Sequence, residues 1–326
     1  MKAFKMAQPK TVEQAVLVST DDFKKSKILA GGTDLLGEIK EGTQVPDLVV
    51  NLKTIPQLGG IRSTDRGLEI GALTKLAELA ESAEVKKGWP ALHTTTLKTA
   101  TPQIRNVGTV GGNICQRPRC WYYRNETFHC LKKGGELCYA RDGENEFHAI
   151  FENATCNIIH PSNLAPVLIA YGAQFEIAGP EGTEIVPAEE FFVTPEEDIA
   201  VENVLAANQV LVNVILPKGS ERPLSAYFES REKQSYDWAV CAATASFVKD
   251  GDRIGEARIV LSAVAPVPMR RDDLEAMLVG QKISDELLDK VCERAVQEAT
   301  PLRDNRYKLI LLKGVLRRAI RQALGA

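Results

Sequence analysis

The sequence predicts an α+β protein built from two domains. Its 326 residues exceed the length of one average domain, and segments with helical and with strand periodicity follow one another without an internal repeat. A polar stretch bounded by prolines interrupts them at residues 217–223 and is the best linker candidate. We therefore expect a first domain at residues 1–217, with subdomains at about 1–55 and 56–217, and a smaller second domain at residues 224–326.

The first domain is predicted to alternate short helices and strands. Thr11 is a candidate N-cap for a helix at 11–19, and a buried strand at 26–32 ends in two glycines. The next helix begins at Thr33 or Asp34 and stops at Gly42. Further elements are expected as strands at 46–52 and 68–73, two helices within 73–92 broken near Gly88 and Pro90, a helix followed by a hairpin within 163–186 that turns at Gly179–Gly182, and a strand at 211–217.

The second domain is predicted to contain a hairpin followed by two helices. Alternating apolar residues at 237–266 surround an Asp250-Gly251 turn, which is typical of a β-hairpin. The chain then ends with helical patterns at 284–300 and 307–326.

Composition is ordinary for a soluble globular protein and excludes several functions. Hydrophobic residues make up 44% and charged residues 25% of the chain, and the formal net charge is −3. This weak negative charge argues against a nucleic-acid partner. No apolar stretch approaches the roughly 20 residues of a membrane span, and the N-terminus lacks the apolar core of a signal peptide. We expect a cytoplasmic protein, or a periplasmic one if a signal-bearing partner exports it in folded form.

Two glycine-rich segments favour a phosphate-containing ligand. They are "LAGGTDLL" at 29–36 and "GTVGGN" at 108–113. Glycine lets the backbone approach a ligand closely, and free N–H groups at a helix start attract phosphate oxygens. Neither segment fits the Rossmann fingerprint or a P-loop. Two separate glycine turns suit a long ligand with a diphosphate, although a tight turn with a helix cap is an equal alternative for the first segment.

Three segments resemble a known family. "KILAGGTDLL", "TPQIRNVGTVGGNI" and "HPSNLAPVL" are similar to the FAD-binding subunit of the xanthine dehydrogenase family of molybdenum hydroxylases, and the similarity covers nearly the whole chain. The resemblance implies a two-part FAD domain of the vanillyl-alcohol oxidase (PCMH) type and a small C-terminal α/β domain of the CO dehydrogenase flavoprotein type.

The resemblance also implies which residues bind FAD. The loop from Ala30 to Leu35 would wrap the diphosphate, and no catalytic residue is assigned. The full expected set is Lys27, Ile28, Leu29, Ala30, Gly31, Gly32, Thr33, Asp34, Leu35, Thr101, Thr109, Gly112, Asn113, Gln116 and Asn163. Asn163 stands where the family usually has an aspartate, and Glu229 stands where a lysine is common. An amide at 163 can still bond a ribose hydroxyl or the flavin edge, but it carries no charge.

The cysteines are unevenly distributed along the chain. Four of the seven lie between Asn113 and Cys138, and Cys156 follows closely. In a reducing compartment such clustering favours metal ligands over disulfides. A subset of the family inserts a loop here, at about 114–160, that carries a [4Fe–4S] cluster. Matching that insert gives the ligands Cys120, Cys130, Cys138 and Cys156, with Cys115 as the spare.

Structural zinc remains an alternative for the same thiols. Zinc sites usually show paired C-x₂₋₄-C knuckles, whereas the spacings from Cys120 are nine, seven and seventeen residues. Four thiolates are what a [4Fe–4S] cluster needs, and six cations in the loop can balance their charge. These are Arg117, Arg119, Arg124, Lys132, Lys133 and Arg141.

These expectations combine into a function. A flavin takes two electrons and passes them singly, and an iron–sulfur cluster carries one at a time. By resemblance, the chain would be an electron-transfer subunit that works with a large molybdopterin-binding subunit, a small [2Fe–2S] subunit and an unidentified external donor or acceptor. The complex would oxidise an aldehyde or N-heterocycle. The alternatives are a 4-hydroxybenzoyl-CoA reductase-like enzyme with reversed electron flow, a zinc-stapled interaction protein, and a free-standing flavin oxidase.

Overall fold

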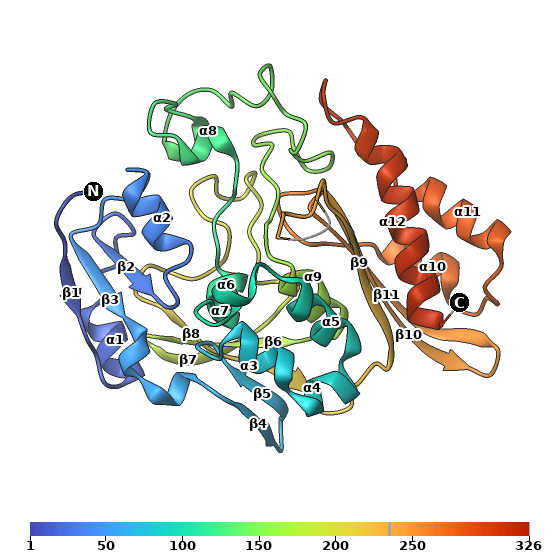
Figure 1. The fold of residues 1–326 in the computed structure, drawn as a ribbon, viewed down its shortest axis with the longest axis horizontal. Helices are drawn as coiled ribbons and strands as arrows, with labels where there is room; N and C mark the ends of the chain where they lie inside the picture. The colour runs from blue at the N-terminus through green and yellow to red at the C-terminus, as the bar shows by residue number, and fades with distance from the viewer. Residues whose placement is uncertain (234–235, 326) are drawn as a thin grey trace.

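The computed structural model describes residues 1–233 and 236–325, and their strands form three sheets (Figure 1). The sheets follow the chain from one side of the molecule to the other, with helices packed on each. This mixture of separate sheets and helices confirms the predicted α+β class. Within the described ranges, no helix is both long and apolar enough to cross a lipid bilayer.

The first sheet is parallel, in the order β1-β3-β2, and helices connect its strands. Parallel neighbours need crossover connections, which α1 and α2 supply. Thr11 caps α1 as predicted, because its hydroxyl accepts the Gln14 N–H at 3.2 Å. The elements are β1 (Lys5–Ala7), α1 (Val12–Val18), β2 (Ser26–Leu29), α2 (Leu35–Lys40) and β3 (Leu48–Asn51). The first glycine segment therefore lies at the carboxyl end of β2.

The second sheet is antiparallel, in the order β4-β5-β8-β6-β7. The predicted hairpin at Gly179–Gly182 joins β6 to β7, with those two glycines paired. Its elements are η1 (Leu52–Thr54), η2 (Pro56–Leu58), β4 (Ile61–Thr64), β5 (Gly67–Gly71), α3 (Leu76–Glu81), α4 (Ala83–Gly88), α5 (Pro90–Lys98), α6 (Pro102–Arg105), α7 (Val110–Ile114), α9 (Leu164–Ala170), β6 (Gln174–Gly179), β7 (Gly182–Pro187) and β8 (Val210–Pro217).

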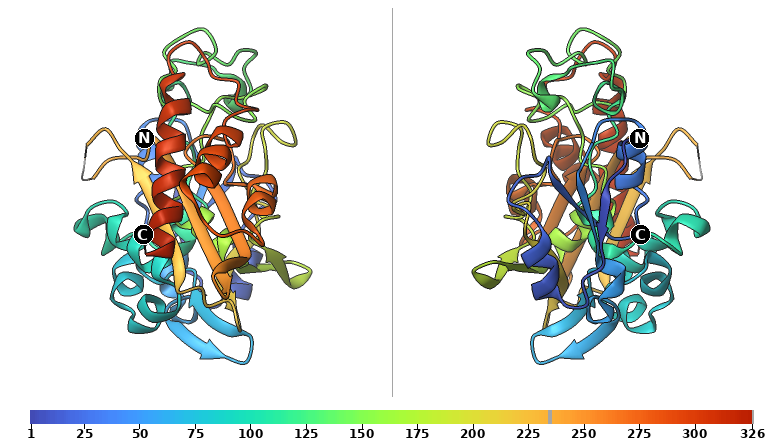
Figure 2. Two further views of the ribbon diagram at one scale, coloured as in Figure 1. Left: turned by 90° about the vertical axis from the view of Figure 1, so that its right-hand side faces the viewer. Right: turned by 90° about the vertical axis from the view of Figure 1, so that its left-hand side faces the viewer.

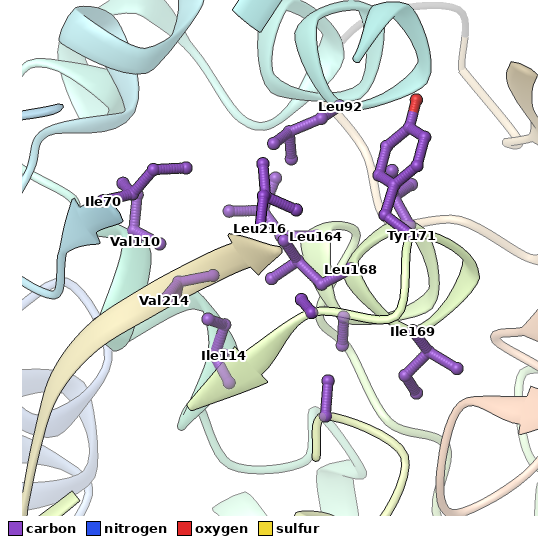
Figure 3. Packing of buried hydrophobic residues seen from close by; sticks show 14 of the residues in the cluster. Ile70, Leu92, Val110, Ile114, Leu164, Leu168, Ile169, Tyr171, Val214 and Leu216 are labelled. Atoms are coloured by element: carbon purple, nitrogen blue, oxygen red, sulfur yellow. The ribbon is translucent and has the colours of Figure 1, made fainter. Parts of the chain in front are cut away.

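The main core joins this sheet to its helices. Figure 3 shows Leu92 of α5, Ile114 of α7 and Leu168 of α9 meeting Val214 and Leu216 of β8. All five side chains are almost completely buried. The short helix α7, which contains the second glycine segment, is thus fixed by apolar packing on one side.

The structure differs from the prediction between residues 73 and 92. Two helices were expected, but α3, α4 and α5 form, because the chain breaks at Ser82 as well as near Pro90. The Ser82 hydroxyl accepts the Val85 N–H at 3.3 Å and so caps a new helix. The second glycine segment was expected as a turn, yet it forms α7, capped by Thr109.

The third sheet is antiparallel, in the order β12-β11-β10-β9, and α12 packs along it (Figure 2). The predicted hairpin at Asp250-Gly251 joins β10 to β11. Residues 218–223, between β8 and β9, contain no helix or strand. The elements are β9 (Leu224–Ser230), β10 (Cys241–Asp250), β11 (Arg253–Ser262), β12 (Met269–Arg270), α10 (Asp272–Leu278), α11 (Asp285–Arg294) and α12 (Tyr307–Leu324). Ala326, predicted to end the last helix, lies outside the described residues.

A long irregular segment, which we term the cysteine segment, connects α7 to α9 over residues 115–163. It holds the short helices α8 (Trp121–Arg124) and η3 (Leu131–Lys133). It arches across one end of the molecule, between α2 on one side and α12 on the other (Figure 1; Figure 2). Because so few of its backbone groups bond within regular structure, side chains must attach it to the rest of the protein.

Asp34, the N-cap residue of α2, makes the first attachment. Its carboxylate accepts the Arg117 backbone N–H at 2.8 Å and forms ion pairs with Arg119 and Arg124. Next to it, the Tyr123 hydroxyl donates to the buried Glu38 of α2 at 2.5 Å. The start of the cysteine segment is therefore tied to the same helix that follows the first glycine segment.

Glu202 makes the second attachment from the loop between β7 and β8. It pairs with Arg117 at 2.8 Å and with the buried Lys132 at 2.6 Å. Burial acts to raise the pKa of Glu202, but the two cations outweigh it and hold that pKa below its ordinary value. This buried triad joins two parts of the cysteine segment to the second sheet.

Lys308 of α12 makes the third attachment. Its ammonium group donates to the carbonyls of Phe147 at 2.9 Å, His148 at 3.0 Å and Ala263 at 3.1 Å. Burial lowers the pKa of Lys308 to about 8. One side chain therefore fixes the returning part of the cysteine segment to the third sheet.

We predict that Glu202→Gln destabilises the protein by about 3–5 kcal/mol at pH 7, because it leaves the buried Lys132 and the partly buried Arg117 without their counter-charge. Glu190→Gln, at an exposed position before β8, is the matched control. The free energy of unfolding from urea titration measures both effects.

The same variant has a defined pH dependence. A carboxylate with a lowered folded pKa contributes stability above its unfolded pKa of about 4.5, and that contribution is lost as the pH falls through the folded pKa. The gap between wild type and Glu202→Gln should therefore close in acid. A loss at pH 7 no larger than that of the control contradicts the role of this triad.

Candidate functional site

One cavity joins the two glycine segments. It has a volume of about 290 Å³ and lies between β2, α2, α7 and the loop before β8. Most of the predicted FAD contacts border it. Those that do are Lys27, Ile28, Ala30, Gly31, Gly32, Thr33, Asp34, Leu35, Thr109, Gly112 and Gln116. The predicted residues Leu29, Thr101, Asn113 and Asn163 do not line it.

The two glycine segments touch through bare backbone. A Cβ on Gly31 would lie 2.4 Å from the Val107 carbonyl oxygen, which no side chain tolerates. Gly32 adopts a φ of +78°, in the left-handed region that favours glycine. The first N–H groups of α7 already donate to the Thr74 and Ala72 carbonyls and to the Thr109 hydroxyl. The cavity wall therefore combines close backbone approach with a glycine in the left-handed region.

The charges around the cavity are mixed. Lys27 and Arg117 border it, as do the carboxylates of Glu38 and Glu202. Burial lowers the pKa of Lys27 to about 8, and the neighbouring Arg117 adds to this effect. Burial raises the pKa of Glu38 despite the Tyr123 hydroxyl that bonds it. With Glu202 already paired to Arg117, Lys27 is the cation best placed to meet an anionic ligand.

Asn163 and Glu229, the two residues expected to differ from the family, meet beside a second, smaller pocket. It is bordered by Asn163, Tyr227 and Trp238, among others. The Asn163 amide donates to the Tyr227 hydroxyl and to the Glu229 carboxylate, both at 3.1 Å. Arg231 forms an ion pair with Glu229. An aspartate at 163 would face Glu229 with a second negative charge, so the two departures fit one another.

Thr101 and Asn113 have mainly structural partners. The Thr101 hydroxyl accepts the Ile104 N–H at 3.2 Å and caps α6. The Asn113 side-chain oxygen accepts the Ser162 hydroxyl at 2.7 Å, which links α7 to the start of α9. Asn113 thus connects the two pockets.

Four cysteines border one small cavity inside the cysteine segment. They are Cys120, Cys130, Cys138 and Cys156, which is the predicted ligand set. Cys115 is separate, since it borders the larger cavity between the glycine segments, where burial raises the pKa of its thiol to about 12. Cys241 and Cys292 lie in the core of the third sheet and its helices, and all seven cysteines are free of disulfides.

Polar hydrogens surround the sulfur atoms. His148 Nε2 lies 3.2 Å from Cys120 Sγ, and the Asn157 amide donates to Cys138 Sγ at 3.2 Å. Backbone N–H groups approach three of the sulfurs as well. A hydrogen bond with Cys156 lowers the pKa of Cys138 to about 5 and raises that of Cys156. Among residues 1–233 and 236–325, no three His, Cys, Asp or Glu side chains are grouped to hold one metal ion.

The six cations of the cysteine segment already have partners within the protein. Arg119 and Arg124 pair with Asp34, and Arg117 and Lys132 pair with Glu202. The other two donate to backbone carbonyls: Lys133 to Asn125 and Arg141 to Ala154. The sequence showed the cations but gave no sign of Glu202, which lies far along the chain from its partners Arg117 and Lys132. Most of these charges thus serve to position the segment.

Two protein-family models together match nearly the whole chain. Residues 2–219 match the FAD binding domain in molybdopterin dehydrogenase, and residues 225–323 match the CO dehydrogenase flavoprotein C-terminal domain.

Individual relatives agree with these matches. The aldehyde oxidoreductase FAD-binding subunit PaoB of Escherichia coli is 30% identical over 99% of both chains. The carbon monoxide dehydrogenase medium chain of Hydrogenophaga pseudoflava is 28% identical over 98% of this chain and 96% of its own. A solved carbon monoxide dehydrogenase structure from the same organism superimposes with a TM-score of 0.77 and 26% identity, covering 99% of this chain and 98% of that one.

The cavity formed by two glycine segments and the full-length matches lead to the same assignment. The chain belongs to the FAD-binding medium-subunit family of the xanthine dehydrogenase and CO dehydrogenase oxidoreductases.

Proposed function

We propose that this chain carries FAD and a [4Fe–4S] cluster and relays electrons within a multi-subunit molybdenum hydroxylase. The main supporting observation is that only a short stretch of backbone separates residues that border the two cavities. Arg117 borders the cavity between the glycine segments, and Cys120 borders the cysteine cavity. Three residues span at most about 11 Å. Two redox groups held in these cavities would thus have walls only a short stretch of backbone apart.

The FAD contacts follow from the larger cavity. We assign the diphosphate to the loop from Ala30 to Leu35 and to Thr109 and Gly112, with Lys27 as the nearby cation. Gln116 closes the same wall. Asn163 borders the neighbouring pocket, and Asn113 bonds Ser162, which also borders it. FAD supplies two-electron chemistry that can be divided into single-electron steps.

The cluster assignment rests on the donor set. Four thiols border one cavity, and N–H groups surround their sulfurs, as in protein iron–sulfur sites. A single ion needs its ligands to converge on one point. A cubane cluster instead places its own irons and sulfides between the thiolates, so four cysteines can hold it from around a cavity.

Substrate chemistry belongs to other subunits in this proposal. The relatives carry names such as medium chain and FAD-binding subunit, which supports partners of the large molybdopterin-binding and small [2Fe–2S] kinds. The full-length similarity to an aldehyde oxidoreductase subunit favours an aldehyde substrate.

Anaerobic purification of the native complex tests the proposal directly. We expect about four irons and one FAD for each copy of this chain, beyond the cofactors of its partners, and a colourless, iron-free chain refutes it.

We predict that Gly31→Ala loses most of its FAD. The added methyl would meet the Val107 carbonyl and push the two glycine segments apart. Gly37→Ala in α2 is the matched control, because its Cβ would meet no atom within 4 Å. The ratio of released flavin to protein measures the effect, and retained iron shows that the rest of the chain is folded. An unchanged flavin ratio in Gly31→Ala would show that FAD binding does not need the close approach of Gly31 to Val107.

We predict that Cys130→Ser loses most of the iron yet keeps FAD, since the glycine segments are not altered. Cys115→Ala is the matched control and should keep its iron, because Cys115 lies outside the cysteine cavity. Iron and flavin are quantified on the same anaerobic preparations. Full iron in Cys130→Ser, or iron loss in Cys115→Ala, shows that the ligand set is wrong.

We predict that His148→Phe lowers the reduction potential of the cluster. A hydrogen bond to a ligating sulfur stabilises the reduced state, and phenylalanine keeps the edge-to-face packing on Trp121 at 5.2 Å while removing the donor. His129→Phe, at an exposed position next to Cys130, should leave the potential unchanged. A redox titration followed by electron paramagnetic resonance measures both. Equal potentials in the two variants contradict the bond.

A further inference from the structure

A broad groove opens on the outer face of the cysteine segment. It has a volume of about 1000 Å³ and lies between α8 and the turns at residues 134–144. Cys138 borders both this groove and the four-cysteine cavity. The groove therefore brings solvent next to Cys138, one of the proposed cluster ligands.

Aromatic side chains form the wall of the groove. Tyr122 and Tyr139 are stacked with ring centroids 6.0 Å apart, and Phe128 meets Tyr139 edge-on at 5.2 Å. Leu137 stands at the groove with 64% of its surface exposed. Flat aromatic faces next to an exposed aliphatic side chain suit a planar aromatic ligand.

The charges of the groove restrict that ligand. Three carboxylates border it, from Glu136, Asp142 and Glu144. The basic residue there is Arg141, whose guanidinium group donates to the Ala154 carbonyl. The net negative charge disfavours anionic ligands and favours neutral or cationic ones.

We propose that this groove binds a neutral or cationic planar aromatic electron carrier of the quinone or phenazine class. The inference rests on the proposed function and names its external acceptor. FAD and a cluster held by this chain would supply two electrons, one at a time. A quinone in the groove would take up both, together with two protons from water at the open groove, and leave as a hydroquinone.

Three small molecules of different charge test the groove on the purified complex. They are menadione, which is neutral, phenazine methosulfate, which is cationic, and 1,2-naphthoquinone-4-sulfonate, which is anionic. Isothermal titration calorimetry with the oxidised complex gives the Kd of each probe. Stopped-flow mixing with the stoichiometrically reduced complex gives the rate of reoxidation. We expect the first two probes to bind more tightly than the sulfonate.

Variants at the groove separate stacking from charge. Tyr139→Leu keeps apolar volume but removes the ring, and should weaken menadione binding about 3- to 10-fold. Leu137→Ala, at an exposed side chain, should weaken it about 3-fold. Asp142→Lys should reduce or invert the preference against the sulfonate. Leu17→Ala, also exposed but in α1, is the matched control and should change nothing.

The outcomes distinguish this inference from the proposed function on which it rests. A complex with no iron beyond that of its partner subunits overturns both. An iron-loaded complex whose Kd values and reoxidation rates are unaffected by the groove variants overturns the groove alone. Equal binding of all three probes, unaltered by Asp142→Lys, also overturns it. Weaker binding and slower reoxidation in Tyr139→Leu and Leu137→Ala, with Leu17→Ala unchanged, support it.

Discussion

The arrangement of this protein depends on buried charges that hold an irregular segment in place. The cysteine segment has little regular structure, so it does not satisfy its own backbone groups as a helix or a sheet does. Asp34, Glu202 and Lys308 attach it to the three parts of the fold that carry the three sheets. Glu202 is buried with its cations and Lys308 is buried against three carbonyls, so these attachments are specific to their partners. The position of the four thiols follows from these contacts.

The same contacts connect the two proposed cofactor sites. Asp34 belongs to the first glycine segment and is also the counter-ion of Arg119 and Arg124. Arg117 borders the larger cavity and is held by Glu202. A rigid, short connection of this kind suits electron relay, in which the donor and acceptor must keep a fixed separation. The fold thus supports the proposed function through geometry and not through any catalytic side chain.

Local signals made much of the fold predictable from the sequence. The cap at Thr11 and the hairpin turns at Gly179–Gly182 and Asp250-Gly251 depend on neighbouring residues, and each appears where it was expected. The helix break at Ser82 was missed, because a serine between two helical patterns is an ambiguous cap. The second glycine segment was expected as a turn and is helical, since packing of α7 on the core overrides the low helix propensity of glycine.

The candidate site was predictable to the extent that it is local. The glycine segments and the clustered thiols are visible in the chain and border two cavities. The anchor Glu202 was not predictable, because it has no motif and meets Arg117 only through the fold. The proximity of His148 to Cys120 likewise depends on how the segment returns past α12.

The pairing of Asn163 with Glu229 has a consequence for how such a sequence can change. The amide is a donor that the neighbouring carboxylate requires, and Arg231 balances the remaining charge. An acid at 163 would set two anions face to face, whereas a lysine at 229 would place two cations side by side. The charges at the three positions are therefore interdependent, and a substitution at one of them changes what the other two tolerate.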